Sequence, residues 1–280
     1  MGQVLFIVWR ESVEAILVVG IVFAWLRQHP DGARGLRYMW LGVAVGLAMA
    51  VILGLGLLGV NEVLQGNADQ LFQTGMVLVA AGLIVQMVVW MRRHGRTLKR
   101  ELEQGANEAV QNSHYIGLAV LVALAVAREG AEMVVFLYGM GAATLSSGGL
   151  VPFVGSALVG FVLALATFWA LQLGSRLFSW RNFFRVTEVM LLFLAAALLM
   201  SGVDKLLAMG WLPAGIDPLW NTAWLLDDST RFGGLVSALT GYRAYPALTH
   251  LIVYALYWIG VSLLLGWRPL RRFRAVAHAG

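Results

Sequence analysis

The stretch Arg128-Glu129-Gly130-Ala131-Glu132 stands in the middle of a long apolar run, and Arg10-Glu11-Ser12-Val13-Glu14 repeats its pattern near the start of the chain. Both read Arg-Glu-x-x-Glu, the later one within residues 116–140 and the earlier one within residues 4–26. A charged group at the centre of a membrane helix costs about 2.5–3.5 kcal/mol. Because each motif carries three charges, the pair predicts a functional site inside a membrane.

The composition is that of a polytopic helical membrane protein. Of the 280 residues, 60% are hydrophobic and only 12% are charged, whereas a soluble domain carries about 25% charged residues. The absence of cysteine excludes disulfides, iron–sulfur clusters and thiolate metal sites. The first apolar run holds three charges and is too long for the apolar region of a signal peptide, so we interpret it as a spanning helix.

Seven apolar runs have about the 20 residues that are needed to cross a bilayer. They occupy residues 3–27, 36–60, 71–91, 115–141, 150–174, 183–203 and 246–267. Most Lys and Arg residues lie in alternate connections, and the other connections are acidic. The positive-inside rule therefore places the N-terminus outside and the C-terminus inside. This topology explains the net charge of +5, so nucleic-acid binding is not predicted.

The two motifs lie 118 residues apart, on the first and fourth spans, which run in opposite directions. This predicts one domain, 1–280, built from two inverted three-helix repeats, about 3–91 and 115–203, with the site at their interface. An outer loop, about 204–245, and a seventh helix, about 246–267, complete the all-α fold. A weaker likeness between the third and sixth spans aligns Gln73 with Glu188 at an offset of 115.

The four glutamates are candidate metal ligands. In each motif they stand three positions apart, so their side chains share one helix face. Counting along the helices places all four within about one turn of the same depth. Such a cluster offers oxygen ligands to Ca²⁺, Mg²⁺, Mn²⁺ or iron. Arg10 and Arg128 precede Glu14 and Glu132 by four positions, and we expect them to pair with these carboxylates and orient them.

Other interpretations of the charged residues stay open at this point. The motifs could be ion pairs without a ligand, or a proton relay. A di-iron enzyme would carry Glu-x-x-His, which neither motif has, and no Gly-x-x-x-x-Gly-Lys motif for ATP is present. His250 is either a helix-packing hydrogen bonder or a ligand. Glu188 is either an interfacial ion-pair partner of Arg185 or an acid on the exit path.

The doubled motif, in the first and fourth of seven spans, resembles the oxidase-dependent iron permeases of fungi and the permease subunit of bacterial elemental ferrous iron uptake systems. The resemblance covers the whole chain. It implies that iron, Fe²⁺ or Fe³⁺, is a transported substrate, that no cofactor is permanently bound, and that the protein is not an enzyme. The residues it implies as iron-translocating are Arg10, Glu11, Glu14, Arg128, Glu129 and Glu132. Glu188 is similar to a further family acid, and Gln73 stands where relatives often have Glu.

The resemblance also implies partners and a location. Iron would arrive from a separate oxidase or iron-binding protein outside the cell or in the periplasm, and the permease would lie in the cytoplasmic (inner) membrane among lipids. A homo-oligomer is compatible with these features. The Trp-rich outer loop is expected to anchor at the membrane interface, or to form a lid or docking surface. The alternative function is a transporter of another divalent cation or a proton-coupled cation exchanger.

Overall fold

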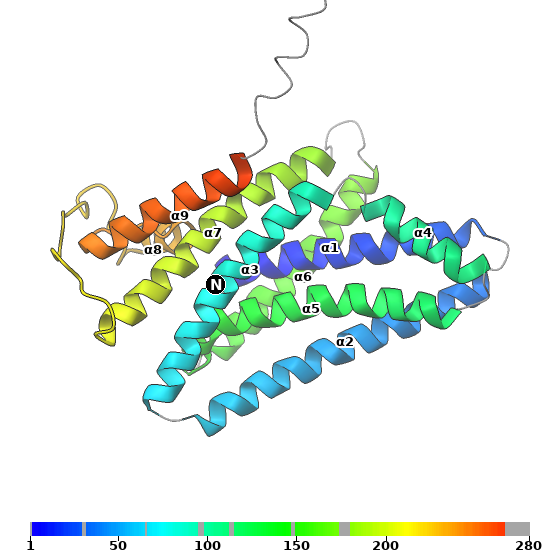
Figure 1. Cartoon of the computed structure of the whole chain (residues 1–280), viewed down its shortest axis with the longest axis horizontal. Coiled ribbons are helices and arrows are strands. Elements are labelled where there is room, and N and C mark those ends of the chain that lie inside the picture. Colours follow the sequence, from blue (N-terminus) through cyan, green and yellow to red (C-terminus); the bar gives the residue numbers. More distant parts are fainter. Residues whose placement is uncertain are drawn as a thin grey trace, which may run out of the picture.

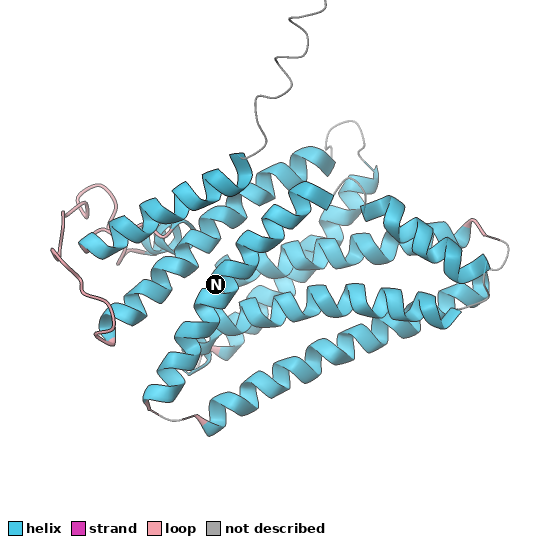
Figure 2. Ribbon diagram, in the orientation of Figure 1, coloured by secondary structure: helices cyan, strands magenta, loops and turns pink. Residues whose placement is uncertain are grey.

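The computed structural model describes residues 2–29, 32–64, 66–94, 98–111, 115–146, 149–173 and 180–266. Within these residues the chain is helical and contains no strand (Figure 2). The helices are α1 (Gly2–Arg27), α2 (Gly32–Val63), α3 (Asn67–His94), α4 (Leu98–Gln111), α5 (Tyr115–Ser146), α6 (Leu150–Leu173), α7 (Trp180–Ala208), α8 (Arg231–Thr240) and α9 (Leu248–Gly266).

Each of the seven predicted spans coincides with one long helix: α1, α2, α3, α5, α6, α7 and α9. Five of these, α2, α3, α6, α7 and α9, are long and apolar enough to cross a membrane. The other two, α1 and α5, carry the three charged residues of one motif each. The protein is therefore a multi-pass helical membrane protein, and the count of seven spans and their orientation stay predictions.

The two motif helices, α1 and α5, lie side by side through the middle of the molecule (Figure 1). On their outer sides, α2 packs along α5 and α6 packs along α1. Helices α3 and α7 form a second packed pair, in which α3 also contacts α5, and α9 packs on α7. Large apolar side chains of α2, α6 and α9 face outward, as expected of helices in contact with lipid.

Two glycines make equivalent contacts with the two motif helices. A Cβ atom added to Gly46 of α2 would lie 2.8 Å from the carbonyl oxygen of Ala123 in α5, and one added to Gly160 of α6 would lie 2.6 Å from that of Leu5 in α1. Leu5 and Ala123 are separated by 118 positions, the spacing of the two motifs, and Gly46 and Gly160 are separated by 114, about one helical turn less. Small residues allow such close approach of membrane helices. The inverted repeat stays a prediction, and this equivalence supports it.

Two apolar clusters enclose the level of the motifs. One joins α1, α3, α5, α7 and α9 and includes Ile7 and Phe136. The other joins α1, α2, α4 and α5 and includes Val18 and Val126. Along α1 the motif falls between Ile7 and Val18, and along α5 it falls between Val126 and Phe136. The charged residues of the motifs therefore form a polar layer between two apolar layers.

The connections contain two short helices. One of them is α4, which packs on α1 and α5 through Leu102 and Ala106. Helix α8, inside the outer connection, is not predicted from the sequence. The Thr230 side chain caps its first turn by accepting a hydrogen bond from the Gly233 N–H, and Gly241, at φ 77°, ends it in the left-handed conformation.

Candidate metal centre

Three of the four motif glutamates come together between α1 and α5. One carboxylate oxygen from each of Glu11, Glu14 and Glu129 can be chosen so that all three lie within 4.8 Å of one another. Glu11 is fully buried, and Glu129 is 7% exposed. The fourth, Glu132, is not a member of this group. We call Glu11, Glu14 and Glu129 the three-glutamate centre.

Arg10 binds two members of this centre. Its Nη1 lies 2.7 Å from Oε1 of Glu11, and its Nη2 lies 2.5 Å from Oε1 of Glu14. The guanidinium is 1% exposed, so water does not screen these contacts. The ion pair predicted between positions 10 and 14 is therefore present, and Arg10 holds two carboxylates in place at once.

Two methionines of α3 cover the other side of Arg10. Nη1 contacts Sδ of Met87, and Nη2 contacts Sδ of Met91 at 3.6 Å. Thioether sulfur is a weak acceptor, so these contacts complete the surroundings of the guanidinium without adding negative charge. The sequence reasoning does not identify these residues. Their spacing of four positions, on one face of an apolar helix, is the signal that could have indicated them.

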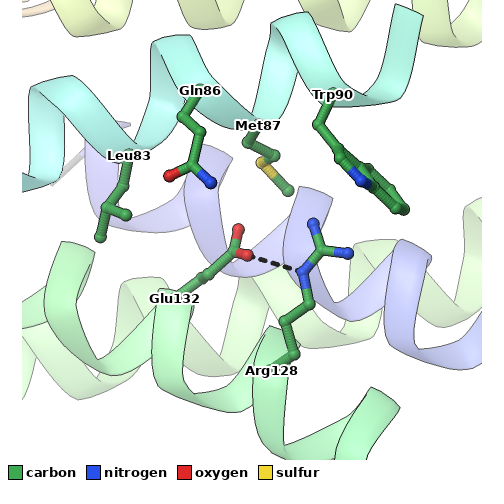
Figure 3. Close-up of a pocket in the computed structure, with 6 residues that line it drawn as sticks. All are labelled: Leu83, Gln86, Met87, Trp90, Arg128 and Glu132. Carbon is green, nitrogen blue, oxygen red and sulfur yellow. Dashed lines mark hydrogen bonds and ion pairs between the residues drawn. The ribbon is translucent and has the colours of Figure 1, made fainter. Parts of the chain in front are cut away.

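The second motif arginine faces a pocket. Nε of Arg128 lies 3.0 Å from Oε1 of Glu132, which is the second predicted ion pair. The pocket has a volume of about 260 Å³ (Figure 3). Its lining residues are Leu83, Gln86, Met87, Trp90, Arg128 and Glu132. The four residues from α3 recur at a helical spacing, so one face of α3 forms the wall opposite α5. Gln86, a polar residue inside an apolar span, is the sequence signal for this face.

Several buried oxygens at this level have no hydrogen-bond partner among the described atoms: Oε2 of Glu11, of Glu129 and of Glu132. A buried polar group without a partner costs about 1–3 kcal/mol, and more when it is charged. Native proteins pair nearly all such groups with other protein groups, ordered water or ions. The arrangement therefore fits a site that receives a cation.

Glu188 forms an ion pair with Arg92 of α3. The sequence suggested Arg185 as its partner; in the structure α3 and α7 lie against each other, and the basic group comes from the neighbouring helix. The Arg92 side chain is 43% exposed and that of Glu188 is 14% exposed. Glu188 is not part of the three-glutamate centre.

Gln73 lies at the opposite end of the α3–α7 pair. Its amide nitrogen donates to both carboxylate oxygens of Asp69 at 3.0 Å, and its amide oxygen accepts from Nζ of Lys205 at 3.2 Å. Gln73 and Lys205 also line a second pocket of about 300 Å³. The two ends of the α3–α7 pair are thus joined by different contacts: Lys205 with the Gln73 amide at this end, and Arg92 with the Glu188 carboxylate at the other.

Both ring nitrogens of His250 are in use. Nε2 lies 2.7 Å from Oδ1 of Asp204, and Nδ1 accepts a hydrogen bond from the Ala247 N–H at 3.2 Å. Asp204 also pairs with Arg243 at 2.6 Å. This network ties the end of α7 to the start of α9, and it matches the packing interpretation of His250. His250 is not brought to the motif glutamates.

Comparison with known proteins places this chain in a family. The iron permease FTR1 family matches residues 1–271. The chain belongs to this family. It is 31% identical over 258 residues to the ferrous iron permease EfeU of Escherichia coli O157:H7, covering 90% of this chain and 91% of the relative. The ferrous iron permease EfeU of Yersinia pestis is 27% identical over 260 residues, covering 92% of this chain and 90% of the relative.

Membership in the iron permease FTR1 family agrees with the resemblance inferred from the motifs, and it supports a role in iron transport across a membrane. A relative described as a putative inactive ferrous iron permease EfeU, from Escherichia coli strain K12, is also 31% identical. No solved structure matches the chain.

Proposed function

We propose that the chain is an iron permease, and not an enzyme, that carries iron across the cytoplasmic membrane through the three-glutamate centre. The observation that supports this most directly is the convergence of Glu11, Glu14 and Glu129, from two helices, within 4.8 Å. All three are buried or nearly so, between two apolar clusters. Carboxylate oxygens suit hard and borderline cations, iron among them.

The charge balance favours Fe²⁺ over Fe³⁺. With all four motif glutamates ionised and both arginines protonated, the two motifs carry a net charge of two negative units. A doubly charged ion neutralises this layer, whereas a triply charged ion leaves an excess that burial would penalise. Four carboxylates without the arginines would instead suit a trivalent ion. The arginines thus set the charge of the ion.

The transport path that we propose begins at the acidic outer connections. Asp227 belongs to this surface, and hydrogen bonds from the Ser229 side chain and backbone lower its pKa, which keeps it anionic. Iron then enters the three-glutamate centre and loses most of its water. The two repeats shift about the site, and the ion leaves on the inner side. Protonation of the glutamates, or re-pairing of a motif arginine with the released carboxylates, weakens binding enough for release.

We propose that the two ends of the α3–α7 pair close the path alternately. Arg92 and Glu188 form the inner clasp, and Lys205 and Gln73 form the outer one. An Arg–carboxylate contact is stronger than a contact between Lys and a neutral amide. The outer clasp is thus the weaker of the two, which favours opening toward the side from which iron arrives.

Exchange of the two inner charges tests this clasp. Arg92→Glu and Glu188→Arg are each expected to slow uptake severalfold, because like charges then face each other, and the double exchange is expected to restore most of it. The pair is partly exposed, so its loss should change stability by less than about 1 kcal/mol. Uptake rates in vesicles, at matched protein amounts, give the measurement. An exchange that fails to restore uptake would assign Glu188 to the ion path itself.

An outer partner is part of the proposal. Because the transported ion that we propose is Fe²⁺, the partner that fits is a soluble iron-binding protein, whereas an oxidase would deliver Fe³⁺. The outer connection between α7 and α9 exposes Trp211, Trp220 and Trp224. We assign these residues to the membrane interface, where Trp commonly lies, and His250 to packing through Asp204.

Uptake into proteoliposomes tests the proposed function. Wild type and Glu14→Gln are supplied with radioactive Fe²⁺ under ascorbate or with Fe³⁺ on a weak chelator. We expect wild type to accumulate Fe²⁺ and the variant to lose uptake, because Gln keeps the shape of the side chain but removes an anionic ligand. Glu108→Gln, the same change at an exposed position of α4, is the matched control and should transport normally.

Three outcomes separate the alternatives. Stronger inhibition by Mn²⁺ than by unlabelled Fe²⁺ would identify another divalent cation as the substrate. Uptake of Fe³⁺ alone would contradict the charge argument. Equal uptake by wild type and Glu14→Gln would show that the motifs are structural ion pairs.

A further inference from the structure

The two motif arginines occupy different environments although their sequence settings are the same. The Arg10 side chain is 1% exposed, contacts two carboxylates and is covered by two thioethers. The Arg128 side chain is 38% exposed and pairs with Glu132 through Nε. Arg10 is therefore held from several sides, whereas Arg128 lies at the wall of a pocket. The inverted repeat predicts equivalence, and the tertiary structure breaks it.

Trp90 covers the Arg128 guanidinium. The Cζ atom of Arg128 lies 4.1 Å from the centroid of the Trp90 ring, well inside the distance of about 6 Å at which a cation is attracted to an aromatic face. Figure 3 shows Trp90 on α3 and Arg128 reaching toward α3 from α5, with Glu132 across from Gln86. The Arg128 side chain is 38% exposed, so the strength of this attraction lies between that on an open surface and that in a desolvated site.

The position of Arg128 matters because a guanidinium and a metal ion compete for the same oxygens. Arg128 adjoins Glu129 in the chain, and Oε2 of Glu129 is buried without a hydrogen-bond partner. An arginine released from the pocket wall would find an unpaired carboxylate oxygen beside it, and a charge-assisted bond to it would be strong. Whatever holds Arg128 at the wall thus keeps the Glu129 carboxylate of the three-glutamate centre free for a cation.

We propose that Trp90 is a positioning residue that holds Arg128 against the pocket wall and away from the three-glutamate centre, and so raises the affinity of that centre for the transported cation. This assignment rests on the proposed function. Trp90 acts through Arg128, and it contacts the ion at no step. It also makes Arg128, not Arg10, the arginine that can approach the carboxylates when the ion leaves.

The test is a cycle of variants on the full-length protein in detergent, with anaerobic Fe²⁺ binding measured by equilibrium dialysis. Trp90→Leu is expected to weaken Fe²⁺ binding about tenfold, which is the size of a partly shielded cation–π contact. Trp90→Phe, which keeps an aromatic face, is expected to retain most of the affinity. In an Arg128→Gln background, Trp90→Leu should cause no further loss, because the competing guanidinium is absent.

Trp169→Leu is the matched control, since Trp169 is an exposed residue of α6 outside both pockets, and size-exclusion profiles verify folding. An equal loss from Trp90→Leu in both backgrounds would show that Trp90 acts by packing and would overturn the assignment. Wild-type affinity in Trp90→Leu would overturn it as well. Absence of Fe²⁺ binding and uptake in wild type would instead overturn the proposed function, and the assignment with it.

Discussion

Replacing Glu129 by Gln is expected to weaken Fe²⁺ binding by more than about 100-fold and to abolish uptake. Loss of a hydrogen-bond partner of a metal ligand typically costs about 10–100-fold in affinity, and we propose Glu129 as a direct ligand. Glu129 is the one member of the three-glutamate centre that comes from α5. Its loss leaves only the two glutamates of α1, both of which are paired with Arg10. Equilibrium dialysis with Fe²⁺ and vesicle uptake measure the two effects.

Glu132→Gln is the matched comparison, because it makes the same change one helical turn away. Glu132 pairs with Arg128 at the pocket and is not in the group of three. We expect a loss of about tenfold, the size typical of a supporting contact. A loss for Glu132→Gln as large as for Glu129→Gln would contradict the division of the four glutamates into three ligands and one supporting group.

Arg10→Gln is expected to have the largest effect on stability. Removal of one partner from a buried ion pair costs about 3–5 kcal/mol, because the other charge stays buried without compensation. Arg10 compensates two carboxylates and is itself 1% exposed. We expect a low yield of folded protein and a clearly lower apparent melting temperature in detergent, measured by the temperature dependence of soluble, monodisperse protein.

The control for this effect is Arg128→Gln, which removes the equivalent arginine of the second motif. Its side chain is 38% exposed, so water screens the ion pair and the loss should be about 1 kcal/mol or less. Adding Glu14→Gln to Arg10→Gln should recover part of the stability, since one uncompensated charge is removed. Equal destabilisation by Arg10→Gln and Arg128→Gln would contradict the difference in burial on which the expectation depends.

Local contacts of the site could be predicted from the sequence. Positions four apart on a helix are neighbours whatever the tertiary structure, so the pairs Arg10–Glu14 and Arg128–Glu132 follow from spacing alone. Long apolar runs likewise become helices in a membrane, where the backbone must satisfy its own hydrogen bonds. The helix α4 was also predictable, because its buried residues recur at helical spacing between charged ones.

Contacts between helices could not be predicted in the same way. Counting residues along the helices predicted that the four glutamates lie at one depth in the membrane. The rotation of α1 and α5 about their axes, which this count does not give, directs Glu132 to the pocket and Glu129 to the three-glutamate centre. The same limit applies to Glu188, whose partner Arg92 lies 96 positions away on α3. Helix α8 was not predicted because its ten residues contain two glycines. It also lies in a connection whose apolar residues show no clear helical spacing.

The sequence by itself determined that this protein is a helical membrane protein with two charged motifs at one level, because burial of charge in an apolar span is costly and visible along the chain. It also predicted the chemical class of the proposed site, since carboxylates without thiols or paired histidines favour oxygen ligation. Only the tertiary structure decided which glutamates meet, and that α3 covers one arginine with thioethers and the other with Trp90. The reason is that the packing of α3 is set by side chains spread over the whole bundle, and no local pattern encodes it.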